Sequence, residues 1–486
     1  MSQFLFGSGN CPIYHEGRLI VKMRPSVSTF AAVGRATAEG LLDSPGLSVL
    51  AAFERAGMIK RVVPLSQPAP EYRPPMGIRG AVAVLANLPA QPVDTTTSNG
   101  INIIEMERDQ DVEDLQIALA RDPNVESVSR IPVRYLVAQP RSGRRSSESR
   151  ATIAATPPAA STMWNLRKIL WSDARALPNF QDADNISVAV LDTGIDENHP
   201  DLQDRVASNE FEHPDLPTAS ANQDIVGHGT HVSGTIAATI NNNLGINGIC
   251  NCQLRSWKIF DDTTEYIAAR NEFAYIVEPV MYRRALLDCL RARVNVINLS
   301  IGGGAPPDFF EQLLFNALLA NGTTIVAAMG NERQFGSPTS FPAAIPGVIA
   351  VGATRVDDKV ANFSNRGNHI SLCAPGVAIW STLPTAPGQV GFDVVAGPGG
   401  RPIEGRPQRR ETDYDAWDGT SMATPHVAAA VALLLANKGT MNPTEVRDQL
   451  TQSVDPVPGM LGQPFHPDYG AGRLNLLRLL SNSNVG

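Results

Sequence analysis

The nine residues ISVAVLDTG (186–194) indicate which class of fold this sequence adopts. They form a nearly continuous apolar run, which is typical of a parallel strand buried on both faces. Four more runs share this character, and segments with helical periodicity separate them. The strand-like runs are 254–260, 294–303, 323–331 and 347–353, and the helix-like segments are 229–240, 280–293, 308–321 and 422–437. This alternation predicts a doubly wound, mostly parallel α/β sheet.

The bulk composition narrows the class of protein. A chain of 486 residues, 43% of them hydrophobic, is long enough for more than one domain. Its formal net charge of −8 gives no support to a nucleic-acid partner or to binding at an anionic membrane. The N-terminus lacks the basic start of a secretory signal, and the apolar runs are shorter than a membrane span. Five cysteines form an odd, sparse set that suits reduced thiols, so we expect a cytoplasmic protein.

The segment 139–162 divides the chain into two parts. It is rich in Ser, Arg, Ala and Pro and has no hydrophobic period, which predicts a linker. Residues 1–138 mix strand-like and helix-like runs and suggest a small α+β domain, whereas 163–486 hold the predicted parallel sheet. The strand-like runs of the first part are 18–23, 81–86, 101–106 and 125–137, and its helix-like runs are 28–42, 47–57 and 111–121.

Four polar residues of the second part stand at predicted strand ends or helix starts. Asp192 ends the first strand, His228 begins a helix in GHGTH, Asn331 follows the strand of AAMGN, and Ser421 stands at the mouth of the helix in DGTSMATPHVAAAVALLLAN. Each has an ordinary interpretation, such as a turn aspartate or a helix-capping serine. However, sites in such sheets form beyond the carboxyl ends of the strands, where these residues would meet.

The order of the sequence blocks resembles the subtilisin-like serine proteases (subtilases). The blocks are VLDTGID, HPDL, GHGTHVSGT, INLSIGG, AAMGNE, FPAAIPGVIAVGA, FSNRG, CAPG and DGTSMATPHVAA, between about residues 164 and 478. The resemblance implies a serine endopeptidase that works through an acyl-enzyme. Ser421 would be the nucleophile, His228 the general base, Asp192 its orienting acid and Asn331 an oxyanion donor.

The same resemblance implies further site residues. Ser300, Ile301 and Gly302 would pair with an extended peptide substrate, and TINNNLGIN resembles a structural calcium loop. The calcium ligands would be Asp201, Ile240, Asn242, Leu244 and Ile246. A polar loop without a metal is the alternative for this segment.

Where relatives carry glycines beside the substrate, this chain has FDDTTEYIA. Asp261 and Asp262, with Glu265, would form an acidic subsite that favours basic substrates, or else only a solvated turn.

Residues 1–138 resemble the propeptide of the family, most of all in DPNVESVSRIPVRYLV. The resemblance implies a self-processing zymogen whose N-terminal domain is an intramolecular inhibitor. It places the cleaved bond near Val137–Ala138, with the arginines of 141–150 as a second candidate. A permanent N-terminal domain is the alternative.

Other features leave alternatives open. An insertion, 384–415, enters just before the serine block and would partly cover the cleft. Cys250 and Cys252 are expected on one face of a strand as core thiols, and His231 and His426 as packing or hydrogen-bonding residues. LDTG alone would suit an aspartic protease, but no second D-T-G or D-S-G occurs. A catalytically inactive binding or scaffold protein of the same fold is the remaining alternative.

Overall fold

The computed structural model describes residues 13–24, 48–65, 100–108, 111–136, 139–140, 163–211, 223–267 and 271–481. It divides into two units, which we describe separately. The smaller unit extends from His15 to Ile131, and the larger begins at Pro132. The linker predicted at 139–162 lies outside the described residues except for 139–140.

The smaller unit is a four-stranded sheet with the strand order β2-β3-β1-β4, covered by two helices. Its elements are β1 (Tyr14–Met23), α2 (Ser48–Arg55), β2 (Ile59–Pro64), β3 (Ile101–Met106), α4 (Val112–Ala120) and β4 (Val125–Pro132). α4 turns Val112, Leu115 and Leu119 towards the sheet, as the apolar spacing of 111–121 predicts. The helix and the strand expected at 28–42 and 81–86 lie outside the described residues.

The larger unit is built on a seven-stranded sheet with the order β16-β15-β14-β12-β7-β9-β8, and its strand pairs are all parallel. Its strands are β7 (Ser187–Asp192), β8 (Val206–Glu210), β9 (Gln253–Lys258), β12 (Val296–Leu299), β14 (Thr324–Ala328), β15 (Ile349–Thr354) and β16 (Leu372–Pro375). All five predicted runs are strands of this sheet, so the predicted fold class is confirmed. The chain moves outward in opposite directions from β7 and from β12, and this reversal creates a crevice at their carboxyl ends.

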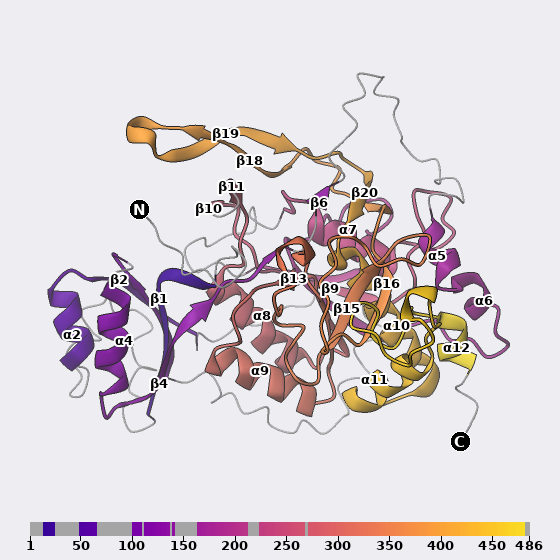
Figure 1. The fold of residues 1–486 in the computed structure, drawn as a ribbon, viewed down its shortest axis with the longest axis horizontal. Helices are drawn as coiled ribbons and strands as arrows, with labels where there is room; N and C mark the ends of the chain where they lie inside the picture. The colour runs from indigo at the N-terminus through magenta and orange to yellow at the C-terminus, as the bar shows by residue number, and fades with distance from the viewer. Residues whose placement is uncertain are drawn as a thin grey trace. The chain divides into compact units, whose positions relative to one another are not determined.

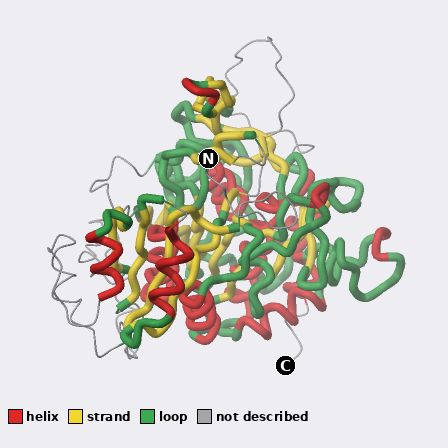
Figure 2. The backbone as a smooth tube through the Cα atoms, turned by 60° about the vertical axis from the view of Figure 1, so that its left-hand side comes forward, coloured by secondary structure: helices red, strands yellow, loops and turns green. Residues whose placement is uncertain are grey.

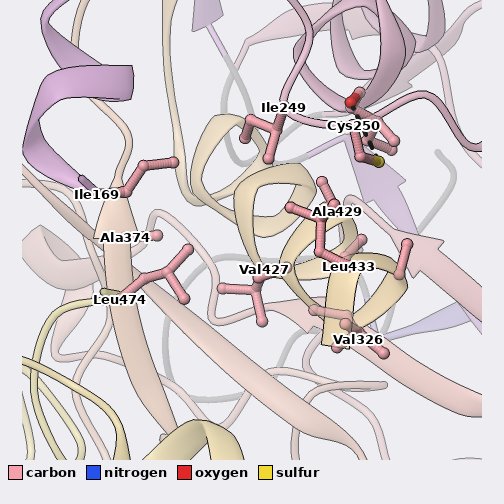
Figure 3. Packing of buried hydrophobic residues seen from close by; sticks show 14 of the residues in the cluster. Ile169, Ile249, Cys250, Val326, Ala374, Val427, Ala429, Leu433 and Leu474 are labelled. Atoms are coloured by element: carbon pink, nitrogen blue, oxygen red, sulfur yellow. Dashed lines mark hydrogen bonds between the residues drawn. The ribbon is translucent and has the colours of Figure 1, made fainter. Parts of the chain in front are cut away.

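Helices flank the sheet, as the red and yellow segments of Figure 2 show. They are α5 (Trp164–Lys168), α6 (Trp171–Arg175), α7 (His228–Ala237), α8 (Pro279–Ala292), α9 (Phe309–Ala320), α10 (Thr420–Lys438), α11 (Pro443–Gln452) and α12 (Leu476–Ser481). α10 is long and apolar enough to span a membrane, but 89% of its most apolar window is buried inside the protein. Figure 3 shows Val427, Ala429 and Leu433 of this helix packed in the core near Val326 of β14. α10 is therefore the central core helix, and it carries Ser421.

The insertion 384–415, for which the sequence predicts no secondary structure, contains two regular strands. β18 (Gln389–Ala396) and β19 (Pro402–Arg409) pair as an antiparallel hairpin, the long ribbon labelled in Figure 1. The hairpin continues a small sheet through β11 (Glu272–Ala274) and β10 (Glu265–Ile267). Its Gly and Pro content hides the strand pattern, and β19 accommodates two prolines because it is an edge strand.

Cys250 and Cys252 are not on a strand, because β9 begins at Gln253, so this part of the prediction is wrong. Both are nevertheless in the main hydrophobic cluster, 0% and 1% exposed. Cys250 Sγ contacts the carbonyl of Ile236 at 3.6 Å, the dashed line in Figure 3. Burial raises the pKa of the Cys252 thiol, which therefore stays protonated. The four described cysteines are free thiols, and the cytoplasmic location stays a prediction.

Candidate active site

Asp192 and His228 form a buried pair at the crevice. Asp192 is the last residue of β7, and His228 is the first residue of α7. Asp192 Oδ1 lies 2.7 Å from His228 Nδ1, and both side chains are 0% exposed. A carboxylate beside Nδ1 favours the tautomer that carries its proton there, so Nε2 is the nitrogen that can accept a proton. Nε2 has no hydrogen-bond partner in the described part of the chain.

Asp224 fixes the geometry of this pair, and the sequence analysis missed it. Its Oδ1 accepts hydrogen bonds from Thr193 Oγ1 and Gly227 N, each at 2.7 Å. Its Oδ2 accepts from the backbone and the hydroxyl of Thr230 at 2.8 and 2.6 Å. One carboxylate thus joins the end of β7 to the first turn of α7. An Asp shortly before a helix start is a capping signal, which could have identified it.

Ser421 is the second residue of α10 and is fully buried. Its Oγ donates to the carbonyl of Ser300 at 2.9 Å, and Ser300 Oγ donates to the carbonyl of Ser421 at 3.0 Å. The structure therefore pairs Ser421 Oγ with a backbone oxygen rather than with His228 Nε2. Catalytic hydrogen bonds often form only when substrate is bound, so this arrangement does not exclude a nucleophilic role.

Asn331 is held with its amide in one orientation. Thr420 donates to Asn331 Oδ1 from its backbone nitrogen and from its hydroxyl, both at 3.0 Å. Because these donors hold the oxygen, the Nδ2 group is the donor end of the amide. Thr420 directly precedes Ser421, so the side chain that holds Asn331 belongs to the same helix start as Ser421. A fixed amide donor beside a serine at a helix N-terminus can stabilise a developing oxyanion.

The predicted substrate strand is paired with the chain's own segment 135–136. β13 (Ile301–Gly302) pairs antiparallel with β5 (Tyr135–Leu136), with Ile301 opposite Leu136. A second pairing joins β6 (Gln139–Pro140) to β20 (Tyr414–Asp418), which ends shortly before Ser421. The predicted cleavage point, Val137–Ala138, falls between these pairs but lies outside the described residues.

The acidic residues predicted as a subsite have local partners. Asp262 accepts a hydrogen bond from Lys258 Nζ at 2.6 Å, and Asp261 accepts from the backbone and hydroxyl of Thr263. Glu265 is the first residue of β10. Asp261 therefore caps a turn, and Asp262 forms an ion pair with Lys258, four residues before it. The sequence analysis did not identify Glu311, a fully buried acidic residue in the first turn of α9.

The residues predicted for calcium are gathered around Asp201, but as a hydrogen-bonded cluster. Asp201 Oδ1 accepts from Asn242 Nδ2 at 2.6 Å. Its Oδ2 accepts from the backbone of Ile246 at 3.0 Å and from Tyr414 OH at 2.9 Å. Asn242 Oδ1 accepts from the backbone of Leu244 at 2.9 Å, so it too faces a donor. Donors aimed at both carboxylate oxygens do not fit a calcium ion, which needs those oxygens as ligands.

His231 and His426, which were expected to be packing or hydrogen-bonding residues, are buried, and each contacts a main-chain carbonyl oxygen. One ring nitrogen of His231 is 3.0 Å from the carbonyl of Ile379, and the ring stacks on Trp417. Burial lowers the pKa of His231 to about 3 and that of His426 to about 4. Both rings are therefore neutral at pH 7, in agreement with the packing role expected for them.

Comparison with known proteins gives one consistent result. The sequence model of the subtilase family matches residues 183–472. The chain is 34% identical over 295 residues to subtilisin E of Bacillus subtilis (strain 168), a match covering 60% of this chain and 65% of that protein. It is equally similar to a subtilisin of Bacillus pumilus, 90% of which is covered.

Among solved structures, fervidolysin of Fervidobacterium pennivorans, described as a keratinolytic enzyme related to subtilisin, superposes with a TM-score of 0.61. The sequence identity is 22%, and the match covers 98% of this chain and 64% of that one. At this identity the likeness concerns the fold.

Proposed function

Because this chain belongs to the subtilase family, we propose that it is a serine endopeptidase that hydrolyses peptide bonds through an acyl-enzyme at Ser421. The observation that carries the proposal is the buried pair of Asp192 and His228, 2.7 Å apart, at the same crevice as the N-terminus of α10. Since the chain spans 65% of the length of subtilisin E, the activity of the whole protein is part of the proposal.

The reaction uses the groups in the following way. Ser421 Oγ turns from the Ser300 carbonyl towards His228 Nε2 and attacks the substrate carbonyl carbon, while its proton passes to Nε2. Asp192 stabilises the imidazolium that forms. Asn331 Nδ2 and the backbone nitrogen of Ser421 donate to the oxyanion. His228 then gives its proton to the leaving amine, and a water molecule repeats the sequence in reverse to release the acid.

We further propose that the enzyme is made as a zymogen and cleaves its own chain. Residues 135–136 pair with β13, and residues 139–140 pair with β20 just before Ser421, as the two halves of a bound peptide substrate would. The bond between Val137 and Ala138, the predicted processing point, lies between those pairs in the sequence. Tethering makes this capture intramolecular, so the effective concentration of the tail reaches roughly the mM range, and the tail inhibits until it leaves.

A pair of purified proteins tests the proposal. Wild type is expected to yield a mature fragment that begins at Ala138, by N-terminal sequencing and intact mass, and Ser421→Ala is expected to remain full length. A wild-type chain that stays intact while it cleaves peptides would contradict the zymogen proposal. A wild-type chain that neither processes itself nor cleaves any peptide would favour the inactive scaffold.

A further inference from the structure

The segment that precedes β5 places an arginine in a buried acidic pocket. Arg134 Nη2 lies 2.8 Å from Glu311 Oε2, and Arg134 Nε donates to Glu311 Oε1 at 3.2 Å. The side chains are 1% and 0% exposed, although the residues are 177 positions apart. Glu311 lies in the first turn of α9. This is the two-pronged geometry in which a guanidinium matches a carboxylate better than an ammonium does.

The walls of the pocket also suit a guanidinium. Arg134 Nη1 donates to the carbonyl of Ala305 at 3.0 Å and to that of Val133 at 3.3 Å. A side chain at Gly303 would collide with the Val133 carbonyl and would place its Cβ 2.9 Å from Arg134 Nη1. Gly303 directly follows β13, so the glycine that continues the substrate strand also leaves room for the arginine.

Arg134 is the cation that pairs directly with the buried carboxylate of Glu311. Besides Arg134, Glu311 accepts only one hydrogen bond in the described chain, from Tyr282 OH at 3.1 Å. The neighbouring Arg283 forms its ion pair with Asp308, and the charge of Glu311 contributes a smaller attraction that also raises the pKa of Arg283. Burial, with the charge of Glu311 as a smaller contribution, raises the pKa of Tyr282, so the phenol is a neutral donor. If Arg134 leaves, the buried carboxylate of Glu311 loses the cation that is hydrogen-bonded to both of its oxygens, which is costly.

We propose that Glu311 and Gly303 form a specificity subsite that selects arginine in substrates. The inference rests on the proposed peptidase function. Arg134 immediately precedes the residues paired with β13, so the pocket receives the fourth residue before the bond Val137–Ala138. A free substrate that follows the same path presents its own side chain at this point. A basic preference thus arises from Glu311, whereas Asp262 is already matched by Lys258.

Internally quenched peptides measure the selectivity. The peptide PVRYLVAQP (132–140) is compared with versions in which Gln or Lys replaces its arginine. Wild type is expected to cleave the arginine peptide with kcat/KM at least about 30-fold above the glutamine peptide, because a site built for a polar partner rejects a ligand that leaves it unpaired. The lysine peptide should lie between them.

The matched variants are Glu311→Gln, which keeps the shape of the side chain, and the triple change Asp261→Asn, Asp262→Asn and Glu265→Gln. In Glu311→Gln the ratio between the arginine and glutamine peptides should fall below about threefold, through slower cleavage of the arginine peptide. The triple variant should keep the wild-type ratio. Equal cleavage by wild type, or a preference that persists in Glu311→Gln, would overturn the subsite. If Glu311→Gln does not fold, the wild-type comparison of peptides decides.

A binding measurement separates failure of the subsite from failure of the proposed activity. The full chain with Ser421→Ala and Arg134→Gln cannot use the nucleophile, and its own tail lacks the guanidinium. By fluorescence anisotropy it should bind labelled arginine peptide at least tenfold more tightly than glutamine peptide. Selective binding without cleavage by wild type would contradict the peptidase proposal and support the subsite, whereas equal measurable affinity for the two peptides would overturn the subsite. If the tethered tail keeps both peptides out, the cleavage ratio of wild type decides.

Discussion

Two buried aspartates of the larger unit, Asp192 and Asp201, differ in how completely their oxygens are hydrogen-bonded. Both are 0% exposed. Asp201 accepts three hydrogen bonds, which engage both of its oxygens. Asp192 accepts from His228 and from the backbone of Thr193 through Oδ1, while Oδ2 has no partner among the described residues. A buried carboxylate with spare capacity can stabilise a positive charge that appears during a reaction, whereas a saturated one serves the fold.

The contrast predicts opposite effects for the same substitution at the two positions. Asp192→Asn should lower kcat about 10⁴-fold, the decrease that this exchange causes in a serine-protease triad, because the imidazole loses its orienting charge. Asp201→Asn should leave kcat within about threefold and lower the melting temperature. Steady-state kinetics and thermal unfolding of both variants distinguish the roles. A comparable loss of kcat in the two would show that the difference in hydrogen bonding has no functional meaning.

Two asparagines allow the same comparison, with a smaller expected loss of kcat. Asn331→Ala should lower kcat about 10²–10³-fold with little change in KM, a magnitude taken from the corresponding donor of subtilisin. Asn242→Ala should leave both constants unchanged, because among the described residues that amide bonds to Asp201 and to the backbone of Leu244. A loss of less than tenfold in Asn331→Ala would remove this residue from the oxyanion site.

The buried histidines make the folded protein sensitive to acid. The pKa values of His231 and His426 are lowered to about 3 and 4 by burial, whereas an unfolded histidine titrates near 6.5. The unfolded state therefore takes up protons first, and stability is complete above pH 6.5 and falls as the pH drops. Each ring should cost about 1.4 kcal/mol per pH unit between pH 6 and pH 4.5.

Urea unfolding of Ser421→Ala, which avoids self-digestion, measures this slope. His426→Gln should reduce the slope of the unfolding free energy against pH by the contribution of one histidine. An unchanged slope in that variant would show that His426 does not stay neutral in the folded protein.

The smallest expected effect concerns the phenol that completes the Asp201 cluster. Tyr414→Phe removes one hydrogen bond to a charged oxygen, which should cost about 1–2 kcal/mol of unfolding free energy.

Because the wild-type cluster is already satisfied, a chelator should leave its melting temperature unchanged. A fall of several degrees in chelator, restored by added Ca²⁺, would show that the loop binds the ion that the sequence predicts.

The parallel sheet was predictable, and so were the positions of the three candidate triad residues at strand ends and helix starts, because the sequence signals for both are local. A buried strand reads as an apolar run, and Asp192, His228 and Ser421 stand where such strands end or helices begin. The specificity pocket was not predictable in the same way. Arg134 and Glu311 are far apart in sequence, and nothing local marks either as buried. The two strands within the insertion were not predicted, because Gly and Pro mask a strand pattern that pairing with β11 and an exposed edge make possible.

The central claim is that Ser421 is a nucleophile activated by His228 and Asp192. A fluorophosphonate probe tests it directly, because the activated hydroxyl displaces fluoride and leaves a stable phosphonyl-serine. Mass spectrometry of the labelled, processed protein should place the adduct on Ser421, with labelling absent in Ser421→Ala and retained in Asp201→Asn. A wild-type protein that remains unlabelled, or an adduct that persists in Ser421→Ala, would contradict the account.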